Sequence, residues 1–241
     1  MATSGSIPRG VWMLGFVSLF MDVSSELIHS LLPVFMVTSL GATALMVGMV
    51  EGVAAATGLI VKVFSGTLSD WLGKRKGLTV LGYGLGALSK PLFALALSVH
   101  WVFAARFMDR IGKGIRGAPR DALIADLTPP EIRGAAYGLR QSLDSVGAFI
   151  GPLAAVGLMI LWAGDFRTVF WFAVIPGVLS VVLLIFFVHE PVTPRTGAAP
   201  ASPIRWRTLG DLGAVYWWVV AAGGAFTLAR FSEAFLLLRA Q

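Results

Sequence analysis

The fold of this chain is decided by the stretch Gly66-Thr67-Leu68-Ser69-Asp70-Trp71-Leu72-Gly73-Lys74-Arg75-Lys76, which lies between two long apolar segments. Its glycines permit a tight connection. Its three consecutive cations favour the cytoplasmic face of a bilayer, where lysine and arginine are enriched in loops. The stretch therefore predicts a short cytoplasmic turn between two membrane-spanning helices.

The composition extends this prediction to the whole chain. Of the 241 residues, 56% are hydrophobic and 13% are charged, whereas roughly 45–50% of residues in soluble domains are apolar. Because about twenty apolar residues cross a hydrocarbon core of about 30 Å, the repeated apolar windows predict an all-α membrane protein with about seven spans. The expected spans are residues 11–38, 44–70, 77–98, 101–126, 131–162, 166–189 and 211–239.

The cations are placed at alternate helix ends. A net charge of +6 would suit a nucleic-acid-binding protein, but phosphate binding needs an exposed basic surface rather than loops beside a membrane. The positive-inside rule instead predicts a cytoplasmic N-terminus. We therefore expect a multi-pass protein of the bacterial inner membrane, in contact with lipid and without a nucleic-acid partner. The predicted cytoplasmic side carries Arg9, Lys74, Arg75, Lys76, Arg133, Arg195, Arg205 and Arg207, and the opposite side carries His100, Asp165 and Arg167.

The turn at residues 66–76 resembles the helix 2-3 loop signature of the major facilitator superfamily of secondary transporters. The resemblance implies alternating access between two related bundles, with Gly66, Asp70, Gly73, Lys74 and Arg75 as a gating loop on the cytoplasmic side. It also implies a six-helix bundle over residues 1–189, a cytoplasmic linker over 190–210 and the first helix of a second bundle over 211–241. The chain covers only half of that fold, so we expect either that it is a fragment or that the rest of the second bundle lies elsewhere.

Three ionisable residues share one face of the first predicted helix. Asp22, Glu26 and His29 stand at i, i+4 and i+7. Counted at about 1.5 Å per residue from Trp12, Asp22 lies about 15 Å deep, near the bilayer centre. A carboxyl group at that depth favours its neutral form, which permits proton exchange. The stripe resembles the helix 1 acids that couple protons in several multidrug exporters, and the alternative is neutralisation by a fixed partner on the fourth helix.

The fourth predicted helix is rich in cations. Its start resembles the superfamily's helix 4 signature, with Arg106 as the intramembrane arginine, although Asp109 and Arg110 replace the usual Gln-Gly. Charges at this depth need counter-charges, which would be the helix 1 carboxylates, an anionic or metal-chelating substrate, or both in turn. Alternatively, Arg116 and Arg120 extend to the interface and bind lipid head groups. The expected cavity residues on this helix are Arg106, Asp109, Arg110, Lys113 and Arg116.

Glycines on the fifth predicted helix indicate a transport direction. Gly138, Gly147, Gly151 and Pro152 resemble the superfamily's antiporter signature, which exporters carry, although its final glycine pair is replaced here. Packing alone would also explain these glycines, because small residues let helices approach closely. Glycines four apart predict close packing at Gly48/Gly52, Gly82/Gly86, Gly134/Gly138 and Gly147/Gly151.

Several further ionisable residues lie inside apolar runs. Arg140 and Asp144 neutralise each other at i and i+4 and are further cavity candidates. Arg230 and Glu233 on the last helix are also cavity candidates. We expect interhelix pairs or interface anchors at Glu51, Lys62 and Lys90.

These observations predict a secondary transporter of a small molecule, with proton-coupled efflux as the leading mode. The alternatives are uptake or exchange of an organic anion or metal chelate, and a non-transporting membrane sensor or assembly subunit. The chain has no cysteine and no HExxH or nucleophile-elbow motif. We therefore expect no enzyme activity, catalytic residue, cofactor or bound metal.

Overall fold

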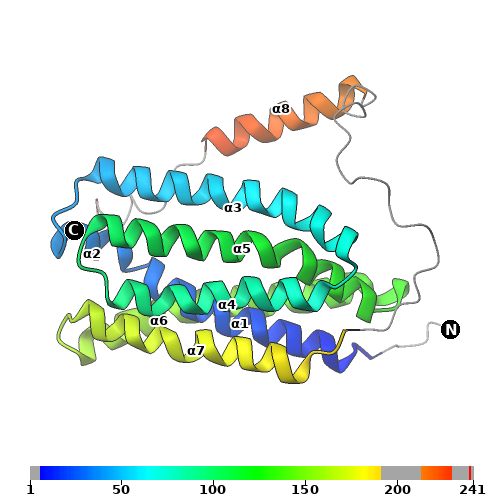
Figure 1. Cartoon of the computed structure of the whole chain (residues 1–241), viewed down its shortest axis with the longest axis horizontal. Coiled ribbons are helices and arrows are strands. Elements are labelled where there is room, and N and C mark those ends of the chain that lie inside the picture. Colours follow the sequence, from blue (N-terminus) through cyan, green and yellow to red (C-terminus); the bar gives the residue numbers. More distant parts are fainter. Residues whose placement is uncertain (1–5, 191–212, 230–238, 240–241) are drawn as a thin grey trace.

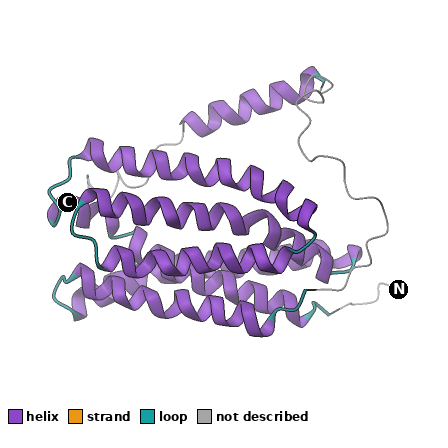
Figure 2. Ribbon diagram, in the orientation of Figure 1, coloured by secondary structure: helices purple, strands orange, loops and turns teal. Residues whose placement is uncertain are grey.

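A computed structural model describes residues 6–190, 213–229 and 239 of the chain. Within these residues every regular element is a helix (Figures 1 and 2). The elements are α1 (Arg9–His29), α2 (Leu32–Thr38), α3 (Ala44–Leu72), α4 (Arg75–Ala94), α5 (Val99–Leu127), η1 (Pro130–Ile132), α6 (Arg133–Leu161), α7 (Phe166–Phe187) and α8 (Ala214–Ala229).

The first predicted span is divided, and the prediction of one helix over residues 11–38 is wrong in this respect. A turn at Ser30 and Leu31 separates α1 from α2, and Pro33 lies in the first turn of α2. Proline has no N–H and clashes with the carbonyl one turn earlier, so it starts a helix more easily than it continues one. The other spans of the bundle agree with their predicted bounds to within a few residues, and α8 covers the described part of the seventh span.

Side chains and one glycine fix the helix ends. The side chains of Thr43, Ser98 and Asp165 each accept a hydrogen bond from a backbone N–H in the first turn of α3, α5 and α7 respectively, as N-cap residues do. A hydrogen bond from the Thr168 hydroxyl (2.6 Å) holds the pKa of the exposed Asp165 carboxyl below its usual value. Gly73 ends α3 with a φ of 61°, a left-handed conformation that glycine adopts without a steric penalty.

The six spans pack in the order α3, α5, α4, α7, α1, α6. Exchanging α1 with α5, α3 with α6 and α4 with α7 reproduces this order in reverse. Since helix direction alternates along the chain, the two three-helix units are related as an inverted repeat, an arrangement found in transporters. Figure 1 shows these spans side by side, with α8 lying apart from the bundle.

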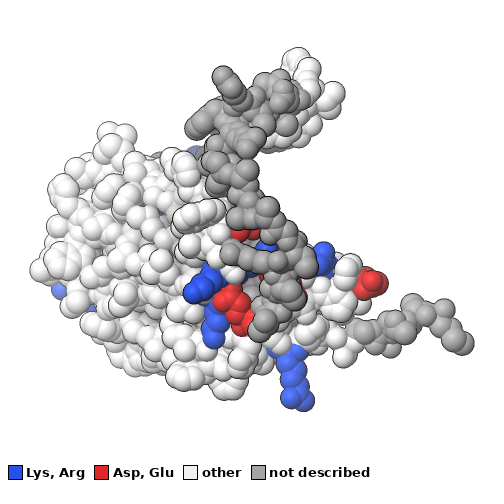
Figure 3. Space-filling view, turned by 45° about the vertical axis from the view of Figure 1, so that its right-hand side comes forward, with Lys and Arg blue, Asp and Glu red and all other residues white. Residues whose placement is uncertain are grey.

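The surface of the bundle is mostly apolar. The outer helices α3 and α6 expose large apolar side chains such as Leu59, Ile60, Phe149 and Leu153, and charged side chains gather at one end of the molecule (Figure 3). In the described part of the chain, four stretches are long and apolar enough to cross a membrane. The molecule is therefore built as a membrane protein. The four stretches are Arg9–Thr38, Ala44–Leu72, Pro130–Leu161 and Phe166–Phe187.

Close glycine packing occurs between α4 and α5. A Cβ atom on Gly82 would lie 2.7 Å from the Gly112 carbonyl oxygen, and one on Gly86 would lie 2.8 Å from the Arg116 guanidinium. The packing prediction is therefore confirmed for Gly82 and Gly86. It is wrong for Gly52, Gly134 and Gly138, because a Cβ atom on any of them would have no neighbour within 4 Å among the described residues.

Candidate functional site

An open cavity of about 460 Å³ lies among α1, α3, α5 and α6. Its wall carries six cationic and three acidic side chains, an unusual charge density for the interior of an apolar bundle. The charged lining residues are Asp22 from α1, Lys62 from α3, Arg110, Lys113, Arg116, Arg120 and Asp121 from α5, and Arg140 and Asp144 from α6.

Two of the six cations are paired with an acid. Arg120 lies 3.2 Å from the Asp121 carboxylate and also donates hydrogen bonds to Ser18 and Tyr83. Arg140 donates to Asp144 at 2.8 Å, as the i, i+4 spacing predicted. The other four have no carboxylate within 4 Å and no hydrogen-bond acceptor among the residues that the structure places. These four are Lys62, Arg110, Lys113 and Arg116.

Arg116 lines the cavity and is only 3% exposed. Its guanidinium carbon is 4.6 Å from the centre of the buried Tyr83 ring, a distance suited to a cation–π contact. Its Nη1 atom is buried without a hydrogen-bond partner. The tyrosine therefore orients a buried cation whose charge is not neutralised by a nearby acid.

The acidic side of the cavity combines α1 and α6. The Asp22 carboxyl group faces that of Asp144, and the charges of Lys113 and Arg116 also act on it. Asp22 is thus placed beside both a carboxyl partner and unpaired cations.

Glycines bring α6 against the acidic face of α1. A Cβ atom on Gly147 would lie 2.5 Å from the Leu19 carbonyl oxygen and 3.2 Å from Cβ of Asp22. One on Gly151 would lie 2.7 Å from Cβ of Glu26. These two glycines of the antiporter-like motif therefore set the position of both acids, whereas Gly138 has no such contact.

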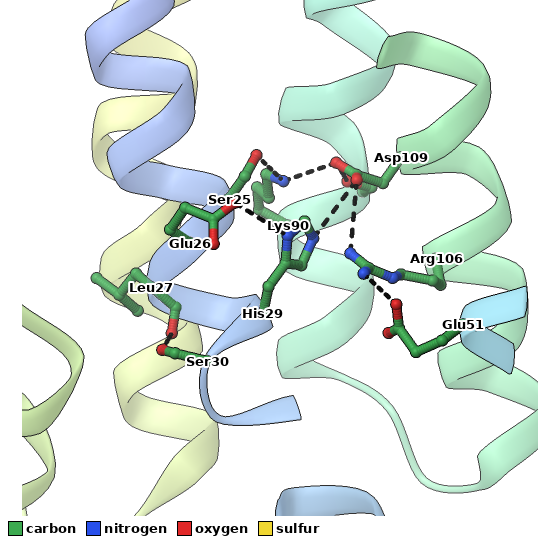
Figure 4. Close-up of polar contacts among 10 residues, drawn as sticks. Ser25, Glu26, Leu27, His29, Ser30, Glu51, Lys90, Arg106 and Asp109 are labelled. Atoms are coloured by element: carbon green, nitrogen blue, oxygen red, sulfur yellow. Dashed lines mark hydrogen bonds and ion pairs between the residues drawn. The ribbon is translucent and has the colours of Figure 1, made fainter. Parts of the chain in front are cut away.

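A separate group of charges, here called the buried network, joins α1, α3, α4 and α5 (Figure 4). Its centre is Asp109, which is 1% exposed and accepts a hydrogen bond of 2.8 Å from Lys90. Lys90 is fully buried and also donates to Ser25 at 2.9 Å. The second Asp109 oxygen lies 3.5 Å from Nε2 of His29, whose Nδ1 lies 3.7 Å from Glu26. The Asp109 carboxylate is therefore hydrogen-bonded from α4 and lies close to the His29 ring of α1.

Arg106 extends the buried network to α3. It donates to Glu51 at 2.6 Å and lies 4.0 Å from Asp109 (Figure 4). These contacts confirm the prediction of interhelix pairs for Glu51 and Lys90.

The gating loop lies at the end of the bundle that carries the N-terminus. Arg75 contacts Asp126 at the end of α5 at 2.7 Å and Asp70 at the end of α3 at 3.7 Å. The backbone N–H groups of Arg75 and Lys76 both donate to Glu190, which follows α7. The loop therefore ties together the ends of α3, α5 and α7.

The predicted site residues divide into two groups. Asp22, Arg110, Lys113, Arg116, Arg140 and Asp144 line the cavity. Glu26, His29, Arg106 and Asp109 belong to the buried network instead. The ionisable residues predicted on α1 and on α5 are therefore each divided between the cavity and the buried network. Arg230 and Glu233 lie outside the described residues.

Sequence reasoning missed part of the cavity wall. Lys62 lines the cavity rather than anchoring an interface, and Asp121 had no assigned role. The signal for Lys62 was a single cation inside an apolar run, which is equally typical of a residue at the membrane interface.

Comparisons with known proteins identify relatives about twice as long as this chain. An uncharacterized MFS-type transporter of Methanocaldococcus jannaschii is 34% identical over 238 residues, which cover 98% of this chain and 57% of the relative. The quinolone resistance protein NorA of Staphylococcus aureus is 26% identical over 188 residues, which cover 78% of this chain and 47% of the relative. The chain thus spans about half the length of the curated relatives it matches.

Solved structures share the fold. A POT family transporter in complex with a thioalcohol-conjugated peptide superposes with a TM-score of 0.70 at 20% identity, over 92% of this chain and 46% of that one. The human organic anion transporter MFSD10 gives a TM-score of 0.64 at 23% identity, over 88% of this chain and 54% of that one. The sequence profile of the Major Facilitator Superfamily matches residues 14–239. The resemblance drawn from the turn at residues 66–76 is therefore confirmed, and the chain belongs to the Major Facilitator Superfamily.

Proposed function

We propose that this chain forms the first bundle of a secondary active transporter that moves a small molecule by alternating access. Residues 1–189 would be the moving bundle, residues 190–210 a cytoplasmic linker, and residues 211–241 the start of a second bundle. Support comes from the family, from the charged cavity and from the match to about half of longer transporters. The cavity would then be closed on its open side by the second bundle.

The orientation follows from the charged end of the bundle. The N-terminus, the α3–α4 turn and the α5–α6 connection all lie at the same end, and they carry Arg9, Lys74, Arg75, Lys76 and Arg133. By the positive-inside rule this end would face the cytoplasm of a bacterial cell, with the chain in the inner membrane.

The leading mode is proton-coupled efflux with Asp22 as the proton-binding residue. The observation that carries it is the position of the Asp22 carboxyl group on the cavity wall, facing Asp144 and lacking a fixed cation within 4 Å in the placed part of the chain. A carboxyl group without a fixed partner can take up and release a proton as the cavity opens in turn to the two sides of the membrane. Efflux is supported by the antiporter-like glycines and by the similarity to a quinolone resistance protein.

Amide substitutions test this mode. Cells that produce the protein should accumulate less of a fluorescent quinolone than control cells, and a protonophore should abolish the difference. Asp22→Asn should raise accumulation to the protonophore level, since the amide cannot bind a proton. Glu26→Gln should have a smaller effect, because Glu26 contacts His29 rather than the cavity.

The matched control is Glu131→Gln, the same chemical change on an exposed residue of η1. It should leave accumulation at the wild-type level, and all variants should be present in membranes in equal amounts. Uphill transport retained in both Asp22→Asn and Glu26→Gln would exclude the proton-coupling proposal.

A second candidate is uptake or exchange of an organic anion or metal chelate. It is favoured by the four cavity cations without an acid partner among the placed residues. The direction of flux into inverted membrane vesicles separates the two modes, because an exporter accumulates its substrate in inverted vesicles and an importer does not.

A further inference from the structure

We infer that Lys62, Arg110, Lys113 and Arg116 form a binding subsite for a multivalent oxyanion, such as a di- or tricarboxylate or a phosphate group, within this bundle alone. The inference deepens the proposed transport function by assigning a chemical class to the molecule that the cavity holds. Its central claim concerns binding and does not require transport.

The charges of the cavity wall are unbalanced. Six cations face three acids, and Asp121 and Asp144 already pair with Arg120 and Arg140. Asp22 is then the single remaining acid against four cations in the described lining. A cavity partly shielded from water strengthens the repulsion among these cations, so a ligand with two or more negative charges would relieve it.

Arg116 is the most buried of the four cavity cations that lack a carboxylate within 4 Å among the described residues. Its side chain is almost fully buried, it lines the cavity and its Nη1 atom has no hydrogen-bond partner. Burying a charged group without a partner is costly. The Nη1 atom itself lies toward Gly86 of α4, so an oxyanion in the cavity would meet the part of the guanidinium that lines the wall, where charge-assisted hydrogen bonds are strong.

Helices α3 and α5 pack against each other at the positions that carry the cavity cations. A Cβ atom on Gly117 would lie 3.5 Å from Cε of Lys62, so the lysine side chain runs in contact distance of α5. A Cβ atom on Gly58 would lie 3.6–3.9 Å from the Arg110 backbone and side chain. Two helices that approach at glycines thus place a cation from α3 next to the cations of α5.

The same oxyanion chemistry is available from a soluble anion and from the head group of an anionic lipid. Lys62 and Lys113 are exposed on the cavity wall, so either source could reach them. The test therefore uses both sources, with citrate as the soluble probe and phosphatidylglycerol as the lipid probe.

The experiment measures citrate binding to the purified chain in a neutral detergent by calorimetry, with succinate and acetate at equal ionic strength. Affinity should rise from acetate to succinate to citrate. Lys62→Gln and Lys113→Gln should each weaken citrate binding about tenfold, the loss expected for one charge-assisted contact. These two side chains are exposed, so their replacement should preserve folding better than replacement of the buried Arg116.

Arg9→Gln is the matched control, because Arg9 is an exposed cation at the start of α1 and does not line the cavity. It should leave citrate affinity at the wild-type level. The inference is overturned if both lysine variants bind citrate as tightly as the wild type, or if acetate and citrate bind equally well.

Nanodiscs identify the natural source of the anion. If phosphatidylglycerol in the disc blocks citrate binding, and fewer of these lipids remain bound to the lysine variants in native mass spectrometry, the subsite holds a lipid head group. If citrate binds equally with and without this lipid, the subsite holds a soluble anion. No gradient is used, so failure of Asp22 as a coupling residue would leave this result unaffected.

Discussion

The buried network and the cavity both contain charged side chains of α5, but these side chains have different partners in the two regions. In the buried network, Asp109 is held by Lys90 and lies near His29 and Arg106, so buried charges of both signs meet. In the cavity, one to two helical turns further along α5, Lys113 and Arg116 have no carboxylate within 4 Å in the described part of the chain.

This difference distinguishes two roles of charged residues inside a membrane protein. A buried charge with a well-placed partner is part of the structure, and removing one member leaves the other uncompensated. A charge that faces a cavity without such a partner is free to meet a ligand or a proton. Neutralising substitutions in the two regions should therefore have opposite consequences for stability.

The largest effect is expected at Lys90. Lys90→Met leaves the Asp109 carboxylate buried without its closest cation, which should cost about 3–5 kcal/mol of unfolding free energy. Thermal unfolding of the purified protein in detergent measures the loss. The double variant Lys90→Met/Asp109→Asn should recover much of it, because the uncompensated charge is also removed. A single variant as stable as the wild type would show that the network is not structural.

A smaller effect is expected where α6 meets the acidic face of α1. Gly147→Ala places a methyl group 2.5 Å from the Leu19 carbonyl oxygen, and overpacking of this kind costs about 1–3 kcal/mol. Gly138→Ala is the matched control, because its methyl group meets nothing within 4 Å in the described structure. The control should match or exceed wild-type stability, since alanine is favoured over glycine in helices by about 1 kcal/mol. Equal melting temperatures for both variants would contradict the packing assigned to Gly147.

The smallest effect on stability is expected in the cavity. Lys113→Met and Lys62→Met remove exposed charges that have no carboxylate within 4 Å among the described residues. Each should change the free energy of unfolding by no more than about 0.5 kcal/mol, with a gain where repulsion is relieved. A loss similar to that of Lys90→Met would show that the cavity cations have structural partners.

The sequence predicted the fold well because its signals are local. Apolar length located the spans, and the turn at residues 66–76 identified the superfamily. The break between α1 and α2 also has a local signal, Pro33, which the predicted span over residues 11–38 did not use.

The site was predicted less completely, because pairing between helices is not local. Spacing placed Asp22 and Glu26 on one face of α1, as the structure has them, but could not show that only Asp22 lines the cavity. Arg106 and Asp109 were expected in the cavity and lie in the buried network instead. Their true partners, Glu51 and Lys90, come from helices whose approach depends on packing across the whole bundle.

The packing order of the helices has an electrical consequence. Under the exchange that maps one three-helix unit onto the other, α1 and α5 are counterparts. Yet α1 contributes the acid Asp22 to the cavity wall and α5 contributes most of the cations. The bundle thus repeats its backbone but not its charge: the charged lining residues of α1 and α3 cancel, whereas those of α5 and α6 carry a net positive charge. The resulting field would turn the negative end of an entering molecule toward α5 and α6.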